Sequence, residues 1–475
     1  MYREYVVLLL PVLAILIYLV KRGITSRSIS AEYLVVLFFV LCIPFGYGFS
    51  FWGIYGMDGL PGTLGLFFRF GFIQITAIAS ILIMPRAKLK IGNNFFSVKR
   101  IVILLLLLLI SFFNPNNQSI LASAIGAYSL LSVLFLSFII NNSFDYRNTL
   151  SALIDGLVVI SVIQLILSVC FPVFDLRVVT TLFHDDVGRV DLVGELAHRN
   201  GAVGTFDHPG KLGLFMSINA ILFFSFFLNQ VKRSFFGLLL VIAFIIIILT
   251  VSRTSLFFVL IVFTFMFFVS RYPKVNFLNP FILSGVTLLL VIVTGAVIML
   301  TPLKEHFLSS NALEMFDARL AHFRMAFGIF EKSPLIGVGI NSHLAFAREF
   351  ISSEVLGTAL SEDFAYTNPI HNIHLIVLAE FGIIGFICWI SFLFIELKGF
   401  RERFIYGQDD ITKSLNLACV GILFLVIFYG VAGWSPFTEN FLSYLIFIVS
   451  FVHIVNARRN KFDSRCLNFQ PDSKQ

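Results

Sequence analysis

The chain has 475 residues, of which 58% are hydrophobic and 13% are charged. A soluble core does not need so much apolar surface, so this composition excludes a soluble globular protein and indicates a polytopic membrane protein. The formal net charge of +7 does not indicate nucleic acid, because a basic excess in a membrane protein is typical of cytoplasmic loops. The five cysteines show no spacing typical of metal or redox chemistry, so no disulfide framework is expected.

Apolar runs of about 16 to 23 residues predict the transmembrane helices. The fold class expected is therefore all-α, a polytopic membrane protein with about 12–13 transmembrane helices. The first run leads into Lys21 and Arg22 instead of a small-residue cleavage site, so no cleavable signal peptide is expected. The predicted spans are 5–20, 31–47, 65–84, 101–113, 120–140, 150–173, 212–229, 235–251, 255–270, 278–300, 373–397, 415–432 and 441–455.

Basic residues assign the two sides of the membrane. They fall on alternate connections, which the positive-inside rule makes cytoplasmic together with the C-terminus. These basic connections are 21–27, 86–100, 147, 232–233, 271–274, 398–413 and the tail from 458. The connections between them are then periplasmic: 48–63, 114–119, 174–210, the turn at Arg253, 301–369 and 434–440.

Two periplasmic loops are large, and loops beyond about 15 residues are usually functional or disordered. The second contains a predicted amphipathic helix over 312–331, of the kind that lies along a membrane surface. Its apolar positions are Leu313, Phe316, Leu320, Phe323, Phe327 and Phe330. The predicted division is 1–173 N-terminal transmembrane helices, 174–211 periplasmic loop, 212–300 transmembrane helices with the Arg253 hairpin, 301–370 large periplasmic loop, 371–457 C-terminal transmembrane helices and 458–475 cytoplasmic tail.

Arg253 stands in T-V-S-R-T-S between two spans that are barely long enough to cross, so a tight hairpin should hold it at the outer membrane face. Two interpretations fit this position. The side chain either snorkels to lipid phosphates or grips a lipid-linked diphosphate, because a guanidinium stays charged and binds phosphate oxygens bidentately.

The segment A-H-R-N-G-A-V-G-T-F-D-H-P-G-K-L-G-L-F, residues 197–215, ends a loop and enters a span. Its Gly and Pro residues are typical of a tightly turned backbone that lines a cavity. Arg199 and Lys211 flank it, and a helix that begins here would point backbone N–H groups at an anion. A simple amphipathic loop that leads into a span explains the same residues.

Arg319 and Arg324 lie five residues apart on the predicted amphipathic helix. Five residues correspond to about 500° of helix, so the two side chains diverge by about 140° and cannot both face one ligand. One of them is expected to serve structure. The G-V-G that follows does not indicate a nucleotide site, because no strand precedes it.

His371 and His374 open the stretch N-P-I-H-N-I-H-L-I-V-L-A-E-F-G-I-I-G, residues 368–385. Three residues apart, they could share a helix face and bind a metal. We favour acid–base chemistry, since no H-E-x-x-H pattern accompanies them and a neutral imidazole can take a proton from a hydroxyl. Glu380, deeper in the predicted span, is interpreted as an orienting partner or as a satisfied buried carboxylate.

This stretch resembles the H-N-x-x-L-x-x-L-x-E-x-G-x-x-G signature of the O-antigen ligase/polymerase family of bacterial inner-membrane glycosyltransferases. Three further motifs resemble the family in order and spacing. They are G-T-F-D-H-P-G-K-L-G, S-R-T-S and R-L-A-H-F-R-M-A-F-G-I-F-E-K-S-P-L-I-G-V-G, and the resemblance covers roughly residues 199–385. H-P-G stands where the family more often has H-P-N.

The resemblance implies a GT-C-like fold in the inner membrane with the active site facing the periplasm. It implies an undecaprenyl-diphosphate-linked glycan donor, attack by an acceptor hydroxyl, and no nucleotide sugar, cofactor or metal. His371 resembles the catalytic histidine, and Arg253 and Arg319 the arginines that hold the donor diphosphate. Arg199, Lys211 and Arg324 are further diphosphate candidates, and Glu380, Asn372, His374 and His208 are supporting candidates.

Arg199 and Gly210 form an R-x10-G spacing that resembles O-antigen polymerases, which extend a lipid-linked repeat. A chain-length regulator and a flippase are then expected partners. The first alternative is a ligase that transfers the glycan to lipid A core. A lipid-linked glycan or solute transporter is the second, and it should carry ionisable groups near the bilayer midplane. A non-enzymatic assembly partner is a further alternative.

Overall fold

The computed structural model describes residues 30–45, 72–83, 97–174, 201–206, 208–273, 275, 285, 310–346, 370–407, 409–433 and 435–467. Every regular element in these ranges is a helix, which confirms the all-α fold class. The elements are α2 (Ala31–Cys42), η1 (Ile43–Phe45), α3 (Phe72–Ile83), α4 (Val98–Phe112), α5 (Ile120–Ser143), α6 (Tyr146–Phe174), α9 (Pro209–Leu228), α10 (Arg233–Leu249), α11 (Arg253–Arg271), α14 (Ser310–Lys332), α17 (Ile373–Tyr406), α18 (Asp410–Ala432), η3 (Ser435–Phe437) and α19 (Glu439–Leu467).

Six helices among the described residues are long and apolar enough to cross a membrane: α5, α6, α9, α11, α17 and α18. Four shorter apolar helices accompany them, Ala31–Cys42, Ile73–Ile83, Arg233–Leu249 and Phe441–Ala457. A polytopic membrane protein is therefore confirmed. The predicted span 5–20 lies outside the described residues, as does 278–300 apart from Gly285, and α3 covers only the last part of the predicted span 65–84.

The bundle core forms where α9 packs against α10, α11 and α18. Aromatic rings fill this core, and Phe265 of α11 stacks on Phe424 of α18 with ring centroids 3.9 Å apart. Apolar side chains on the outside of the bundle remain exposed, such as Leu106 on α4 and Leu238 on α10. Such surfaces are suited to hydrocarbon, so they are the expected lipid-facing sides of the helices.

A sharp bend at Gly382 divides α17 within the predicted span 373–397. Gly382 has φ 63° and ψ −164°, a backbone conformation that only glycine adopts readily. Residues fifteen apart in a straight helix are separated by about 22 Å, yet Trp389 Nε1 lies 3.1 Å from His374 Nδ1. The segment before Gly382 therefore folds back beside the segment that follows it.

The other end of α17 extends beyond the predicted span 373–397. Residues 398–406 were expected in a cytoplasmic connection, but α17 continues to Tyr406 and only 407–409 separate it from α18. Lys398, Arg401 and Arg403 favour a helix almost as well as leucine does. These charged residues therefore end the apolar run, but they do not end the helix.

The loop after α14, residues 333–346, docks on the bend of α17 through its backbone. The Val338 N–H donates to the Ala379 carbonyl at 3.0 Å, and the Ile383 N–H donates to the Pro334 carbonyl at 2.9 Å. A Cβ at Gly337 would lie 2.2 Å from the Glu380 carbonyl carbon, so only glycine allows this approach. The G-V-G sequence thus belongs to a docking site, which we call the glycine junction (334–339 against 379–384).

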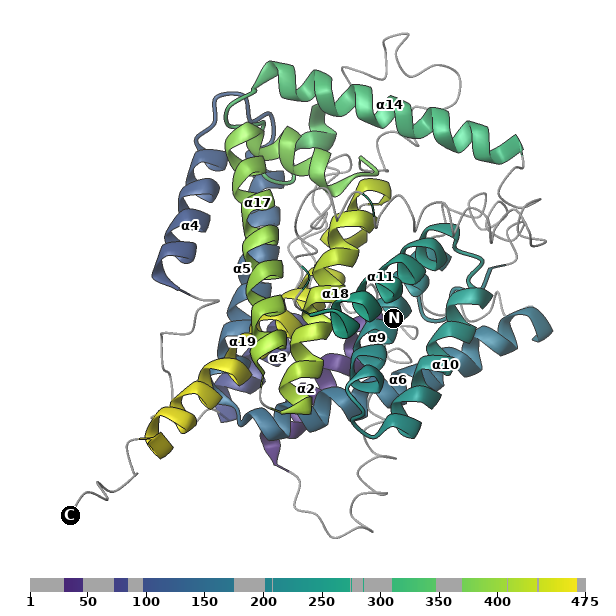
Figure 1. Ribbon diagram of the computed structural model, residues 1–475. Coiled ribbons are helices and arrows are strands. Elements are labelled where there is room, and N and C mark those ends of the chain that lie inside the picture. The colour runs from purple at the N-terminus through teal and green to yellow at the C-terminus, as the bar shows by residue number, and fades with distance from the viewer. Residues whose placement is uncertain are drawn as a thin grey trace.

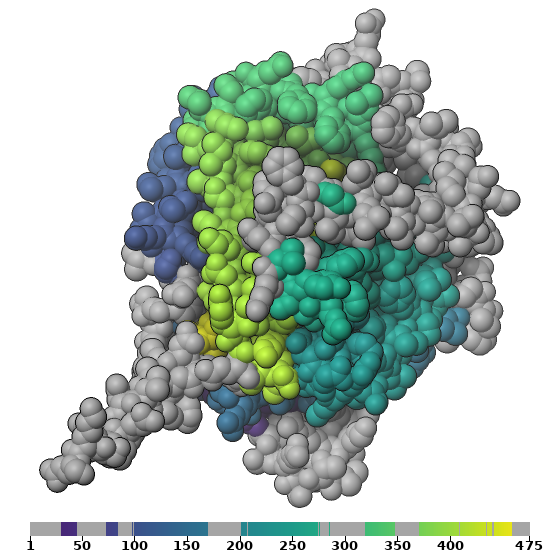
Figure 2. Space-filling model, viewed as in Figure 1, coloured from purple at the N-terminus to yellow at the C-terminus, as the bar shows by residue number. Residues whose placement is uncertain are grey.

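The start of α5 and the turn before it hold the same loop from another side. The Ser123 hydroxyl donates to the Ile340 carbonyl at 2.9 Å, and the Asn341 amide donates to the Ala122 carbonyl at 3.1 Å. The Asn114 amide donates to the Gly337 carbonyl. In Figure 1 α14 lies across this end of the bundle, above α17, and Figure 2 shows the two helices forming one continuous surface.

Below α14 lies a second, smaller hydrophobic core that is separate from that of the bundle. Met325, Ala326 and Ile329 of α14 pack there against Ile376 and Ala379 of α17. α14, the loop and the first segment of α17 therefore form one packed unit at this end of the molecule.

A buried ion cluster lies toward the far end of α17. Glu396 Oε1 lies 2.5 Å from Arg100 Nη2 of α4, and Glu396 Oε2 lies 2.5 Å from His453 Nε2 of α19. Arg403 Nη1 lies 3.2 Å from His453 Nδ1. Because arginine can only donate, Nδ1 accepts and the His453 proton is on Nε2, which donates to Glu396. This ion cluster (Arg100, Glu396, Arg403 and His453) joins α4, α17 and α19.

Candidate active site

The N-terminus of α17 positions His371 immediately before the helix. Asn372 is the N-cap, and its side-chain oxygen accepts from the backbone N–H groups of His374 at 2.9 Å and Leu375 at 3.0 Å. Such a cap fixes the first turn and satisfies donors that the helix leaves unpaired. His371 is only partly buried, so its ring sits at the positive end of a helix with access to a ligand.

His374 has a structural role. The Trp389 indole N–H donates to His374 Nδ1 at 3.1 Å, so the proton of the neutral imidazole is on Nε2. That nitrogen lies 2.8 Å from the Ile427 carbonyl of α18 and donates to it. Both nitrogens are therefore used, and His374 ties the folded-back segment of α17 to α18.

His371 stacks on a second histidine, which comes from α14. The rings of His322 and His371 are nearly parallel, at 8°, with centroids 4.8 Å apart. His322 is only 3% exposed and belongs to the face of α14 that is buried on α17, with Met325 and Ile329. The two histidines are 49 positions apart in the chain.

His322 is uncharged at neutral pH. Burial, followed by the nearby His371, His343 and Arg319, lowers the pKa of His322 to about 3. Two protonated imidazoles in parallel contact would repel each other. His371 is the less buried member of the pair.

Glu380 pairs with a histidine that the sequence analysis did not single out. Glu380 Oε1 lies 2.7 Å from His343 Nδ1, and both side chains are buried. His343 lies in the loop after α14, whereas Glu380 lies at the bend of α17. The bend at Gly382 keeps Glu380 beside the glycine junction, where its carbonyl accepts from the Gly339 N–H at 2.9 Å.

Cationic side chains converge on Tyr429 near the end of α18. The Tyr429 hydroxyl is within hydrogen-bonding reach of the Ser255 and Ser435 hydroxyls, and Arg319 and Lys211 are close enough to act on it electrostatically. Lys211 is 7% exposed and Tyr429 is 4% exposed. Positive charge from α14 and α9 is thus concentrated in a place that is shielded from bulk water, where it acts strongly.

Arg253 is the first residue of α11, next to this group. Three residues, 250–252, connect α10 to α11, and Ser252 caps α11 by accepting from the Ser255 N–H at 3.4 Å. The Ser255 hydroxyl lies 3.5 Å from the Gly210 carbonyl, which brings the start of α11 against the start of α9. Arg253 is partly buried.

His208 caps α9 from an exposed position. Its Nδ1 accepts from the Gly210 N–H at 2.9 Å, and Pro209 is the first residue of the helix. A proline is tolerated there because the first N–H groups of a helix have no partner within it. Lys211 is therefore in the first turn of α9, at the positive end of the helix.

The two arginines of α14 point in different directions, as their spacing predicts. Arg319 is partly buried and acts on both His322 and Tyr429, whereas Arg324 is exposed. The predicted apolar stripe of this helix is shifted, since Leu320 and Phe327 are 41% and 48% exposed. Arg199 lies outside the described residues.

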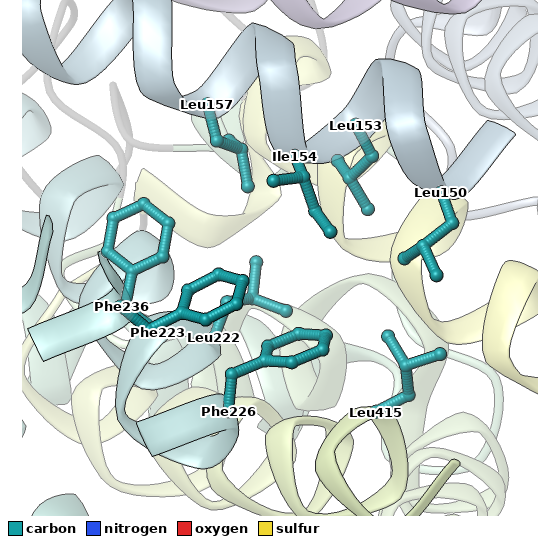
Figure 3. A pocket seen from close by; sticks show the side chains of 9 residues that line it. All are labelled: Leu150, Leu153, Ile154, Leu157, Leu222, Phe223, Phe226, Phe236 and Leu415. Carbon is teal, nitrogen blue, oxygen red and sulfur yellow. The ribbon is translucent and has the colours of Figure 1, made fainter. Parts of the chain in front are cut away.

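An apolar gap elsewhere in the bundle does not belong to this site. Figure 3 shows side chains of α6, α9, α10 and α18 around it, from Leu150 to Leu415. All nine lining residues are apolar, and the cavity of about 10 Å³ is at the lower limit for a single water molecule. It holds neither a diphosphate nor a sugar.

Sequence reasoning missed His322 as a functional residue, and it missed His343 and Tyr429 entirely. His322 follows Arg319 by three positions, a spacing that places both on one helix face, so this signal was present. His343 and Tyr429 reach the site only through the glycine junction and the packing of α18, for which no local pattern exists. Within the described ranges, no group of three or more His, Cys, Asp or Glu could hold a metal ion.

Comparison with known proteins agrees with this geometry. A search of the curated proteins found no match, whereas the family model described as O-antigen ligase matches residues 238–390. The matched range contains Arg253, Arg319, His322 and His371, and it ends before α18. Residues 238–390 are therefore similar to the O-antigen ligase family.

Proposed function

We propose that this protein polymerises undecaprenyl-diphosphate-linked oligosaccharide repeat units of an O-antigen, capsule or exopolysaccharide at the periplasmic face of the inner membrane. The observation that carries the proposal is the convergence of one accessible histidine with several cations at one end of the bundle. His371 stacks on His322, which Arg319 approaches, and Arg319 and Lys211 approach Tyr429.

The reaction is a glycosyl transfer. A hydroxyl of the acceptor sugar attacks the anomeric carbon of the donor, a new C–O bond forms, and the bond from that carbon to the phosphate oxygen breaks. The electron pair of that bond leaves with the undecaprenyl diphosphate, and His371 takes the hydroxyl proton. The partly buried position of His371, with His322 kept neutral beside it, suits it to act as the base.

The cations stabilise the leaving group. Arg253, Arg319 and Lys211 would match the charge that develops on the diphosphate, and fixed charges in a site shielded from water stabilise such a transition state strongly. The positive end of the α9 helix dipole, close to Lys211, adds to this charge. The reaction proposed in this way needs no nucleotide sugar and no divalent ion.

A ligase is the second candidate, and the description of the matching family model favours it. Both reactions use the same donor and the same leaving group, and they differ in the acceptor. The polymerase adds a glycan to another lipid-linked repeat, whereas the ligase adds it to lipid A core. The R-x10-G spacing of Arg199 and Gly210 supports the polymerase.

The test is the surface-polysaccharide profile on a gel. A strain that lacks the gene is complemented with the wild type or with His371→Ala, at equal membrane expression. We expect His371→Ala to lose the wild-type profile. A single repeat unit attached to core then indicates a polymerase, and long chains stranded on the lipid carrier indicate a ligase. A normal profile with His371→Ala would show that the catalytic assignment is wrong.

A further inference from the structure

The imidazole of His322 is buried without hydrogen bonds. Neither ring nitrogen has a partner among the described residues, and the residue is 3% exposed. Buried polar atoms are normally paired, and leaving them unpaired destabilises a protein. His374 and His453 in the same chain have both nitrogens paired. His322 therefore carries unused hydrogen-bonding capacity.

The stacking places the unpaired ring nitrogens of His322 near His371, the proposed base. The rings of His322 and His371 are nearly parallel, at 8°, with centroids 4.8 Å apart, so they stack face to face. A ligand bound to the His371 ring therefore lies close to the His322 ring. The groups that face His322 are His371 from the start of α17, His343 from the loop after α14, and Arg319 one turn earlier on α14.

The chemistry of a neutral imidazole selects the ligand. It has one donor and one acceptor, and a sugar hydroxyl also donates and accepts, whereas an ionised phosphate only accepts. Arg319 and Lys211 are suited to the phosphates. His322 is thus matched to the carbohydrate and not to the diphosphate. A sugar ring carries neighbouring hydroxyls, so one can face His371 while another faces His322.

We infer that His322 is a second substrate-binding histidine, which holds a hydroxyl of the acceptor sugar beside the hydroxyl that His371 deprotonates. This inference rests on the proposed glycosyl transfer. It assigns the acceptor subsite to the edge of the histidine pair, between α14 and the start of α17.

His322→Phe tests the inference, because phenylalanine keeps an aromatic ring to stack and removes both nitrogens. The wild type and the variant are purified into lipid nanodiscs. The substrate is the undecaprenyl-diphosphate-linked oligosaccharide extracted from the deletion strain. We expect kcat/KM to fall at least tenfold while the unfolding temperature stays equal or rises, because two unpaired buried nitrogens are gone. Binding of undecaprenyl diphosphate alone should be unchanged.

Two further variants sharpen the result. His322→Gln restores a donor and an acceptor and should recover part of the lost rate. Phe327→Leu, on the exposed side of the same helix, is the matched control and should transfer at the wild-type rate. The inference is overturned if His322→Phe transfers normally, if it weakens binding of undecaprenyl diphosphate as much as it slows transfer, or if its activity falls only in proportion to a lower unfolding temperature.

The same assay separates this inference from the proposed function. If His371→Ala transfers glycan as fast as the wild type, the proposed function itself fails. If His371→Ala is inactive and His322→Phe is normal, the glycosyl transfer stands and only the role of His322 is wrong.

Discussion

The buried histidines of this chain differ in how their ring nitrogens are used. His374 and His453 each have both nitrogens in hydrogen bonds that join helices, whereas His322 has none among the described residues. A paired histidine stabilises the fold, and an unpaired one is retained at a cost in stability. This difference separates His322 from the structural histidines His374 and His453.

The first residue-scale prediction concerns pH. The pKa of His322 is lowered from its ordinary 6.5 to about 3 in the folded protein, so the unfolded chain binds more protons between these values. The free energy of unfolding is therefore independent of this titration above pH 6.5, and it decreases as the pH falls toward 3, by up to about 1.4 kcal/mol per pH unit.

The measurement is the unfolding temperature in detergent at pH 7 and pH 5.5. Between pH 7 and pH 5.5 the unfolding temperature of the wild type should fall more than that of His322→Phe, which has no group to titrate at this position. An equal loss in both proteins would contradict the lowered pKa.

The second residue-scale prediction compares the two arginines of α14. Arg319→Ala should lower the transfer rate about a hundredfold, because it removes a fixed positive charge beside Tyr429 and His322. Arg324→Ala should have a much smaller effect, since Arg324 is exposed. Initial rates in nanodiscs decide between them, and equal losses in the two variants would argue against the assignment of Arg319.

Sequence patterns predicted the polar residues that lie within motifs, and they failed for those that folding brings together. His371, Arg319 and Lys211 stand in recognisable stretches, and the structure places them at one end of the bundle. Tyr429 ends an apolar run that looks like any other span, and His343 stands in a loop without periodicity. Only the packing of α18 and the docking of the loop give these residues their neighbours.

At the scale of elements, most helices follow the apolar runs, but the bend in α17 does not. Gly382 interrupts no apolar pattern, so hydrophobicity alone predicts one straight helix. The interruption becomes visible only with the partner segment, because the backbone of 334–339 occupies the space that a Cβ would need. The predicted end of the same helix was placed too early, at the first charged residues. Lys and Arg favour helix as strongly as many apolar residues do, so the helix continues through them.

The element-scale prediction is a matched pair of glycine substitutions in α17. Gly382→Ala should destabilise the protein by at least about 2 kcal/mol, because the residue has φ 63° and its Cβ would lie 2.4 Å from the Leu335 carbonyl carbon. Gly399→Ala should stabilise it by about 0.5–1 kcal/mol, since Gly399 is helical and its Cβ would meet only the end of Arg403 at 3.8 Å.

Thermal unfolding of both variants in the same detergent tests this pair. If Gly382→Ala unfolded at the wild-type temperature, the stability of the protein would not depend on a glycine at the bend.

At the scale of the whole molecule, polar groups gather toward two ends of the bundle. One end holds the candidate active site, and the other holds the ion cluster of Arg100, Glu396, Arg403 and His453. The apolar composition predicted the bundle. It did not predict the ion cluster, because Arg100 and Arg403 were assigned to cytoplasmic connections, whereas Glu396 and His453 were assigned to apolar spans.

The whole-molecule prediction separates stability from activity. Glu396→Ala leaves arginines and a histidine without their anion in a buried place, and breaking a buried ion pair in this way costs about 3–5 kcal/mol. Glu396→Gln keeps a hydrogen-bonding oxygen and should cost less. The unfolding temperature should fall in this order, while the transfer rate per folded molecule stays that of the wild type. A lower rate in the folded fraction would instead link the ion cluster to the reaction.

The glycine junction has a consequence for how the protein unfolds on heating. Its backbone hydrogen bonds, from Val338 to Ala379 and from Ile383 to Pro334, hold the unit that contains Arg319, His322 and His371. That unit has its own small core, so it can open locally while the larger bundle stays folded. Thermal inactivation should therefore begin below the global unfolding temperature, and amide hydrogens of 338–339 and 383–384 should exchange together as it does.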